Sequence, residues 1–93
     1  MGIKSFRHKG LEDFFFTGSK RGIRPEHAER LAEALDQLDR AAHVNDMAYP
    51  GAFLHPLKGE LDGHWSVRIS GNWRVIFRFK DGDAYAVAYV DYH

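Results

Sequence analysis

Three side chains that can transfer protons stand together at the end of the sequence, as Asp91, Tyr92 and His93. Chain ends usually fray and tolerate change, so a structural role alone does not explain three such groups on the last three residues. A carboxylate, a phenol and an imidazole are candidates for general acid and base in one reaction. The terminal triplet is therefore the first candidate for chemistry in this chain.

Basic side chains that could bind phosphate lie upstream of the triplet. Arg68 and Arg74 stand in a β-like segment, and guanidinium groups bind phosphate through forked, charge-assisted hydrogen bonds. His55 and Lys58, in the loop sequence LHPLKG, could close over the side of the segment that carries these arginines. Cutting RNA without a metal needs a base, an acid and a cation that stabilises the charged phosphorane. The alternative is that each arginine is simply an exposed strand residue.

The histidines could instead hold a metal ion. His55, His64 and His93 are the candidates, but no pair has the close spacing of a zinc motif and the chain has no cysteine. We therefore expect neither a metal nor another cofactor. His64, beside Gly63 and Trp65, is interpreted as a solvated histidine without a role in the chemistry.

Length and composition set limits on the class of protein. The 93 residues, 44% of them apolar, are enough for one domain over 1–93 with one core. No apolar run is long enough to span a bilayer and no signal peptide is recognisable, so a cytoplasmic protein is expected. The net charge is zero, but residues 1–24 carry six basic and two acidic groups. Basic blocks of this kind can still present a positive surface to a polyanion.

The first half of the chain has helical patterns. A short strand is predicted over 3–6, a helix over 9–17 that stops at Gly18, and a second helix over 25–41. The second helix carries one apolar stripe, which consists of Ala28, Leu31, Leu35 and Leu38. Residues 43–64 have no clean period and hold two prolines and three glycines between 49 and 64, which predicts a long loop.

The second half alternates as β-strands do. Strands are predicted over 65–70, 73–80 and 84–93, with a tight turn at Asp81-Gly82. The turn sets Lys80 opposite Asp83 and Phe77 opposite Ala86. The fold class is therefore α+β, with one apolar sheet face covered by helices.

The other sheet face is predicted to be open and polar. Continuing the same register places Arg74 opposite Tyr89, while a three-residue loop at 70–72 places Arg68 opposite Arg74. Alternation then puts Asp91 and His93 on this face as well. Tyr92 points the other way in an ideal strand, although a twisted or frayed end could bring it round. Arginines beside aromatic rings suit single-stranded RNA, because rings can stack on unpaired bases.

The chain resembles a known family in these motifs. The LHPLKG loop, the strands W-S-x-R and G-N-W-R, and the terminal DYH are similar to the C-terminal half of HigB-type toxins. This is the host-inhibition group within the RelE superfamily of bacterial toxin–antitoxin systems. The opening IKSFRHKGLEDFF also matches, so the resemblance covers nearly the whole chain.

The resemblance implies a RelE-like fold, with two N-terminal helices packed on a small antiparallel sheet. It implies a metal-independent endoribonuclease that enters the A site of the small ribosomal subunit and cuts translated mRNA. It also implies a helix-turn-helix antitoxin as partner, with DNA contacted only through that antitoxin. The catalytic residues implied by the motifs are His55, Arg74, Asp91, Tyr92 and His93; Lys58 and Arg68 are added as phosphate-binding residues on physical grounds.

Two alternatives remain from the sequence. A non-catalytic module could bind RNA or an antitoxin on the same fold, or the enzyme could cut free RNA without a ribosome. The near-zero net charge argues mildly against the free-RNA enzyme, because a nuclease that grips naked RNA usually gains affinity from excess positive charge. The codon preference, the cut position and the identity of the general base are not readable from the residues.

Overall fold

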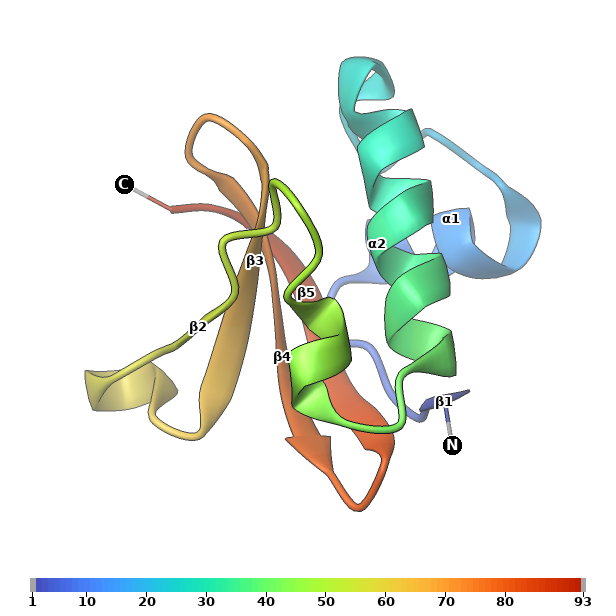
Figure 1. Ribbon diagram of the computed structural model, residues 1–93. Coiled ribbons are helices and arrows are strands. Elements are labelled where there is room, and N and C mark those ends of the chain that lie inside the picture. Colours follow the sequence, from blue (N-terminus) through green and yellow to red (C-terminus); the bar gives the residue numbers. More distant parts are fainter. Residues whose placement is uncertain (1, 93) are drawn as a thin grey trace.

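The computed structural model describes residues 2–92, as short helices packed against one sheet (Figure 1). The elements within this range are β1 (Gly2–Ile3), α1 (Lys9–Thr17), η1 (Pro25–His27), α2 (Ala28–Arg40), η2 (Val44–Met47), β2 (His55–Pro56), η3 (Gly59–Leu61), β3 (His64–Ser70), β4 (Trp73–Lys80) and β5 (Asp83–Asp91), where η denotes a 3-10 helix. The α+β class predicted from the sequence is confirmed.

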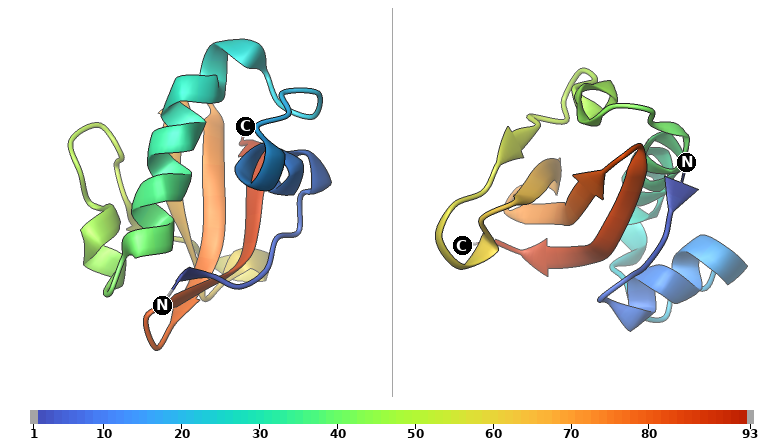
Figure 2. Two further views of the ribbon diagram at one scale, coloured as in Figure 1. Left: turned by 90° about the vertical axis from the view of Figure 1, so that its right-hand side faces the viewer. Right: turned by 90° about the horizontal axis from the view of Figure 1, so that it is seen from below.

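The sheet has the strand order β1-β5-β4-β3-β2. All neighbouring strands are antiparallel except β1 and β5, which run parallel. Figure 2 shows the long hairpin of β4 and β5 (orange to red) at the middle of the sheet. The predicted strand over 3–6 is shorter than expected, because beyond Ile3 only an isolated parallel bridge joins Phe6 to Val87. The sheet is therefore mostly, not wholly, antiparallel.

Both α-helices cover the same face of the sheet, and the main core lies between them and the strands (Figure 1). The predicted stripe of α2 is buried at Leu31, Leu35 and Leu38, which are at most 1% exposed. They pack in one cluster with apolar strand residues, which include Val67, Val75 and Phe77. Burial of this stripe orients α2 across the sheet, as the 3.6-residue period predicts.

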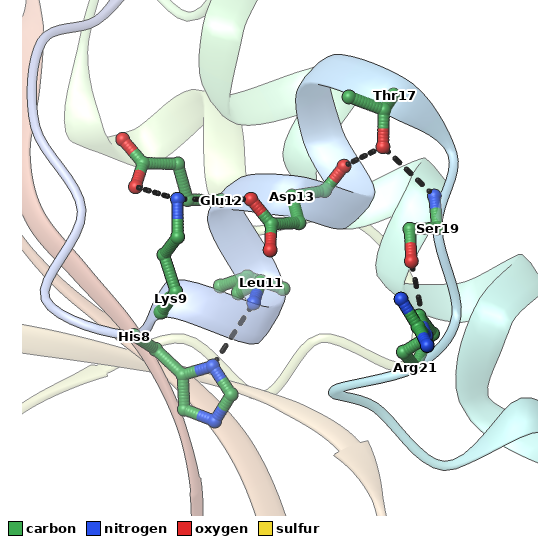
Figure 3. A network of polar contacts seen from close by, with 8 residues as sticks. All are labelled: His8, Lys9, Leu11, Glu12, Asp13, Thr17, Ser19 and Arg21. Carbon is green, nitrogen blue, oxygen red and sulfur yellow. Dashed lines mark hydrogen bonds and ion pairs between the residues drawn. The ribbon is translucent and has the colours of Figure 1, made fainter.

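Local hydrogen bonds fix both ends of α1 (Figure 3). The ring of His8 accepts a hydrogen bond from the Leu11 amide at 2.9 Å, which satisfies one free amide of the first turn. At the other end Gly18 adopts a positive φ of 80° and its amide donates to the Phe14 carbonyl. The stop predicted at Gly18 is confirmed, since glycine adopts this conformation without a Cβ penalty.

The segment between the second helix and β3 contains more regular structure than the predicted loop. The short helices η2 and η3 and the edge strand β2 all fall within it. In β2, His55 pairs with Ser66 and Pro56 with Trp65 of β3. A two-residue edge strand containing proline has almost no sequence signal, because only its neighbour supplies the partners.

A β-bulge at Ala86 changes the predicted register of the β4–β5 hairpin. Near the turn the prediction is correct, with Lys80 opposite Asp83 and Arg78 opposite Tyr85. Beyond the bulge Ile76 lies opposite Ala88 instead of Val87. Ala86 has a φ of +54°, and the extra residue shifts all later pairs by one position.

The bulge is held by the segment that follows β1. The Ala86 amide donates to the Ser5 hydroxyl at 2.9 Å, and the Val87 amide donates to the Ser5 carbonyl at 3.1 Å. The Arg7 amide in turn donates to the Val87 carbonyl. These bonds satisfy the backbone groups that the interrupted ladder leaves unpaired.

The shift exchanges the two faces of the C-terminal half of β5. Arg74 lies opposite Val90, so the predicted pair of Arg74 with Tyr89 is wrong. Tyr89 is instead 4% exposed and packs in the main core on the helix side. Asp91 lies opposite Trp73 and shares the helix side with Tyr89 by strand alternation.

The β3–β4 hairpin keeps the predicted pair that matters for the site. Arg68 lies directly opposite Arg74, as expected. The register then shifts, so that Ser70, rather than Ile69, lies opposite Trp73. Across β4 and β5, Val75 lies opposite Tyr89 and Trp73 opposite Asp91, each one position beyond the pair that an unbroken register predicts.

Candidate functional site

The sheet face that points away from the helices, here called the second face, carries two rows of paired residues. One row runs from Arg68 through Arg74 to Val90 across β3, β4 and β5. The neighbouring row consists of His55, Ser66, Ile76 and Ala88, from β2 to β5. Residues directly opposite each other share a face, so His55 lies one row from the two arginines.

The two arginines form a like-charged pair. Arg68 is exposed and Arg74 is partly exposed. None of the ion pairs among residues 2–92 involves either guanidinium. Like charges at opposite strand positions destabilise a sheet. The pair thus does not serve stability, and its geometry suits a shared anionic ligand.

Three polar atoms of the second face are buried without a hydrogen-bond partner among residues 2–92. They are the Nε of Arg74, the hydroxyl of Ser66 and Nε2 of His64. The Nε of Arg74 and the Ser66 hydroxyl are donors beside the positive pair, and a phosphate oxygen has the chemistry to accept from donors of this kind.

A small apolar cluster occupies the centre of the second face. Leu57, Ile76 and Ala88 are at most 8% exposed and are packed with Leu61 and Val90. The prediction of an open, polar face is therefore only partly correct. The cluster fastens the segment 55–61 to the sheet, and Figure 1 shows this segment (yellow) on the side of the sheet opposite the helices.

This fastened segment positions His55 and Lys58. Nδ1 of His55 lies 3.3 Å from the Phe53 carbonyl oxygen. A carbonyl can only accept, so Nδ1 carries a proton and Nε2 of the neutral ring keeps its lone pair. His55 and Lys58 are both exposed. His55 can therefore present a proton acceptor beside the arginine pair, as the sequence predicts.

The structure places Asp91 and Tyr92, the two described residues of the terminal triplet, on opposite faces of the sheet. Asp91 lies on the helix side of β5, so the expectation that it shares the second face is wrong. The Tyr92 amide donates to the Asn72 carbonyl at 2.7 Å, and alternation carries its 43%-exposed side chain to the side of Val90. Tyr92 therefore does not point away from the second face as an ideal strand would predict, and the alternative, in which the strand end brings it round, describes its place. His93 lies outside the described residues.

A buried cluster of polar rings lies behind the end of β5 and was missed by the sequence reasoning. Nδ1 of His27 lies 2.6 Å from the Tyr89 hydroxyl, and both residues are less than 7% exposed. Trp73 stacks on Tyr89 at 4.6 Å between ring centroids, and the guanidinium carbon of Arg24 lies 5.9 Å from the centroid of the Trp73 ring. Burial raises the pKa of Tyr89 above its usual value. The cluster joins the start of α2 to the strand that leads into the terminal triplet.

His64 is also placed differently from the expectation. It is only 6% exposed, and its Nδ1 lies 3.2 Å from the Leu61 carbonyl oxygen. It is a buried residue of β3 opposite Arg78, not a solvated loop histidine. Within residues 2–92, no three His, Cys, Asp or Glu side chains gather as a metal site. No helix within 2–92 has the length and apolar character needed to cross a bilayer.

Comparison with known proteins gives consistent relatives. A family model described as "RelE-like toxin of type II toxin-antitoxin system HigB" matches residues 4–93. The chain is 41% identical over 91 residues to Endoribonuclease HigB of Proteus vulgaris, covering 98% of this chain and 99% of that protein. It is 33% identical over 90 residues to Toxin HigB-1 of Vibrio cholerae, covering 95% of this chain and 94% of that protein.

The fold also has a solved relative. A chain of the YoeB-YefM complex from Staphylococcus aureus matches with a TM-score of 0.60 at 21% identity, covering 100% of this chain and 97% of that chain. At this level of identity the likeness concerns the fold alone.

Proposed function

The chain belongs to the HigB family of RelE-like toxins of type II toxin–antitoxin systems, and from this premise we propose that it is an endoribonuclease that cuts translated mRNA in the ribosomal A site. The catalytic residues that the family motif implies are His55, Arg74, Asp91, Tyr92 and His93. We propose that His55, Arg74 and Tyr92 act at the second face together with the chain end that carries His93, and that Asp91 acts from the helix side. The observation that carries the proposal is the pair of the exposed Arg68 and the partly exposed Arg74, one row from His55. Such a pair lowers stability unless it binds a polyanion.

The chemistry is a metal-independent transesterification. A base removes the proton of the 2′-hydroxyl, and the 2′-oxygen then attacks the adjacent phosphorus. The bond from phosphorus to the 5′-oxygen breaks, and an acid protonates the leaving oxygen. The products are a 2′,3′-cyclic phosphate and a 5′-hydroxyl, so atoms and charge balance without an oxidant or a metal.

The residues divide between proton transfer and charge stabilisation. His55, with its Nε2 lone pair, is a candidate for the base, and Tyr92 and His93 are candidates for the acid. Arg74 stabilises the doubly charged phosphorane through its guanidinium charge. Arg68 and Lys58 bind the flanking phosphates.

Asp91 has a positioning role in this proposal. It lies opposite Trp73 on the helix side of β5, and its charge contributes to the raised pKa of Tyr89. From there it orients the chain end that carries Tyr92 and His93, rather than contacting RNA.

The partners follow from the same premise. The zero net charge argues that the ribosome, not the toxin alone, gathers the RNA, because a free-RNA nuclease gains affinity from excess positive charge. A helix-turn-helix antitoxin is the proposed neutralising partner, and DNA is contacted only through it. A chain of related fold is part of the YoeB-YefM complex from Staphylococcus aureus, which supports a protein partner of this kind. We place the protein, as a single domain over 1–93, in the bacterial cytoplasm.

The experiment compares His55→Ala with the unchanged protein in a translation reaction, with cuts mapped by primer extension. Removal of a general base is expected to lower the cutting rate by about a hundredfold or more. His43→Ala is the matched control, because it removes an exposed imidazole beside the β4–β5 turn. Full cutting by folded His55→Ala overturns the role of His55.

A further inference from the structure

An exposed aromatic ring stands beside the arginine pair at the edge of β3. Phe53 is 64% exposed, and the guanidinium of Arg68 lies 5.7 Å from its ring centroid. The carbonyl of the preceding Ala52 accepts from the Arg68 amide at 2.7 Å, which fixes the loop against β3. The ring is thus held in place at the surface although it adds little to the core.

The backbone of Phe53 is strained as well. Its φ is +49°, a region that favours glycine and is uncommon for a bulky side chain. An exposed ring in a strained conformation contributes little to folding stability. Strain of this kind gathers at ligand clamps, where the binding function retains it.

A cavity of about 310 Å³ adjoins the ring, lined by Arg30, Glu33, Tyr49, Pro50, Gly51, Phe53 and Arg68. This volume is at the lower end of the range for small-molecule sites. Arg30 donates from Nη1 to the Ile69 carbonyl at 2.7 Å, which holds its side chain at the β3 edge. The wall therefore offers two guanidiniums against one carboxylate, next to a flat aromatic surface.

We propose that this cavity, the Phe53 subsite, binds one unpaired nucleotide of RNA, with the base stacked on Phe53 and its phosphate held by Arg68 and Arg30. Stacking on an aromatic ring and a guanidinium on the phosphate is the combination that binds single-stranded RNA. The inference rests on the proposed function, since it names a subsite next to the proposed cleavage site.

Two contacts join the subsite to the proposed cleavage site. Nδ1 of His55 faces the carbonyl of Phe53 at 3.3 Å, and Arg68 is opposite Arg74. A strand of RNA whose cleaved phosphate lies at Arg74 therefore has a flanking nucleotide within reach of Phe53. The subsite would hold that nucleotide out of the stack and fix the RNA in line for attack.

The test uses ribosomes programmed with mRNA that carries 2-aminopurine at successive positions around the A-site codon. A 2′-O-methyl group on the attacking ribose blocks cutting, and quenching of the fluorescent base reports stacking. The unchanged protein is expected to quench one position, and Phe53→Trp to keep that quenching. Phe53→Gly is expected to lose it. Phe16→Ala is the control, because Phe16 is 67% exposed on α1 within a separate cluster with Phe6 and Phe15.

Cutting of unmodified mRNA is measured with the same variants. Phe53→Gly is expected to raise the ribosome concentration for half-maximal cutting by about tenfold, in line with the loss of one stacked base. Its melting temperature is not expected to fall, because glycine accepts the positive φ without strain. This separates loss of binding from loss of folding.

The remaining outcomes decide the source of the nucleotide and the fate of the proposal. If no mRNA position is quenched but a base of 16S rRNA is protected from chemical modification by the unchanged protein and not by Phe53→Gly, the bound nucleotide belongs to rRNA. If no base in either RNA responds and Phe53→Gly cuts normally, the subsite is refuted while the proposed function stands. If the unchanged protein cuts no mRNA, the proposed function fails first.

Discussion

Arg68 of β3 and Arg74 of β4 lie directly opposite each other, and His55 of β2 stands one row away on the same face. The register of the β3–β4 hairpin maintains this pair. In that register the residues next to the arginines, Val67 and Val75, also lie opposite each other and are buried in the main core. A slip of one position would expose this core, so the arginines cannot separate without cost to the fold. The apolar core thus holds a like-charged pair in place.

Replacement of Arg74 separates its role in catalysis from a role in folding. We expect Arg74→Ala to lower the cutting rate by about a hundredfold or more, because a cation aimed at the phosphorane is lost. The free energy of unfolding is expected to stay level or to rise slightly, since repulsion from Arg68 is removed. Primer extension and urea unfolding measure the two effects.

Arg78→Ala is the control for this change. Arg78 lies on the same strand and face but opposite His64, and it carries the same charge. We expect it to cut at close to the unchanged rate. Equal loss of activity in both variants would mean that only the general positive charge of the face matters.

The buried pair of His27 and Tyr89 is expected to stabilise the C-terminal strand. Tyr89→Phe removes the hydroxyl that lies 2.6 Å from Nδ1 of His27 and leaves this ring nitrogen buried without it. The cost should be about 1–3 kcal/mol in the free energy of unfolding, measured in urea. Tyr85 is half-buried on the sheet face turned away from the helices, so Tyr85→Phe is expected to cost less. An equal cost for both changes would contradict a special role of the buried pair.

The close approach of Gly10 and Gly22 should be intolerant of a side chain. A Cβ on Gly10 would come within 2.6 Å of the Gly22 carbonyl oxygen, and a Cβ on Gly22 would meet the Gly10 Cα. Because both contacts are with backbone, we expect Gly22→Ala to cost about 1–3 kcal/mol or more. Thermal unfolding provides the measurement.

Gly18→Ala is the comparison, because it adds a side chain to a glycine without crowding. Its Cβ would meet no atom within 4 Å, and only the positive φ of 80° opposes it. About 1 kcal/mol is expected there. If Gly22→Ala were no more costly than Gly18→Ala, the close approach would not constrain the fold.

Asp46 should make the free energy of unfolding depend on pH in the acidic range. Hydrogen bonds from the His43 and Ala42 amides hold the pKa of this carboxyl below its ordinary value of 3.8. The folded state therefore binds the proton more weakly than the unfolded chain, and the stabilisation is complete above pH 3.8. It is lost as the pH falls through the lower folded pKa.

The matching variant is Asp46→Asn, which removes the charge and keeps an oxygen acceptor. We expect the unchanged protein to be the more stable at neutral pH, and the difference in melting temperature to shrink below pH 3.8. A difference that grows in acid would mean that the carboxylate does not stabilise the fold.

Much of the fold was accessible from the sequence where a strong local signal exists. The stripe of Leu31, Leu35 and Leu38 and the stop at Gly18 predicted both helices, and the Asp81-Gly82 turn located the main hairpin. The pair of Arg68 and Arg74 followed from the demand that apolar faces match across the β3–β4 loop. These features depend on neighbours in the sequence.

The errors come from features that only the assembled fold determines. An alanine gives no signal for a positive φ, yet the bulge at Ala86 moved Tyr89 and Asp91 to the helix side and Tyr92 toward the second face. The bulge is held by Ser5, which lies 81 positions away along the chain. Phe53 was overlooked for the same reason, because its strain and exposure appear only once the loop lies against β3.

The most direct measurement maps the 5′ ends of an mRNA in a reconstituted translation reaction, with and without ribosomes, after addition of the purified protein. The account predicts cuts in frame, within translated codons, only where ribosomes translate. Cuts of equal pattern and rate on bare mRNA would contradict ribosome dependence. The absence of cuts in both reactions, with the protein folded and free of antitoxin, would contradict the ribonuclease itself.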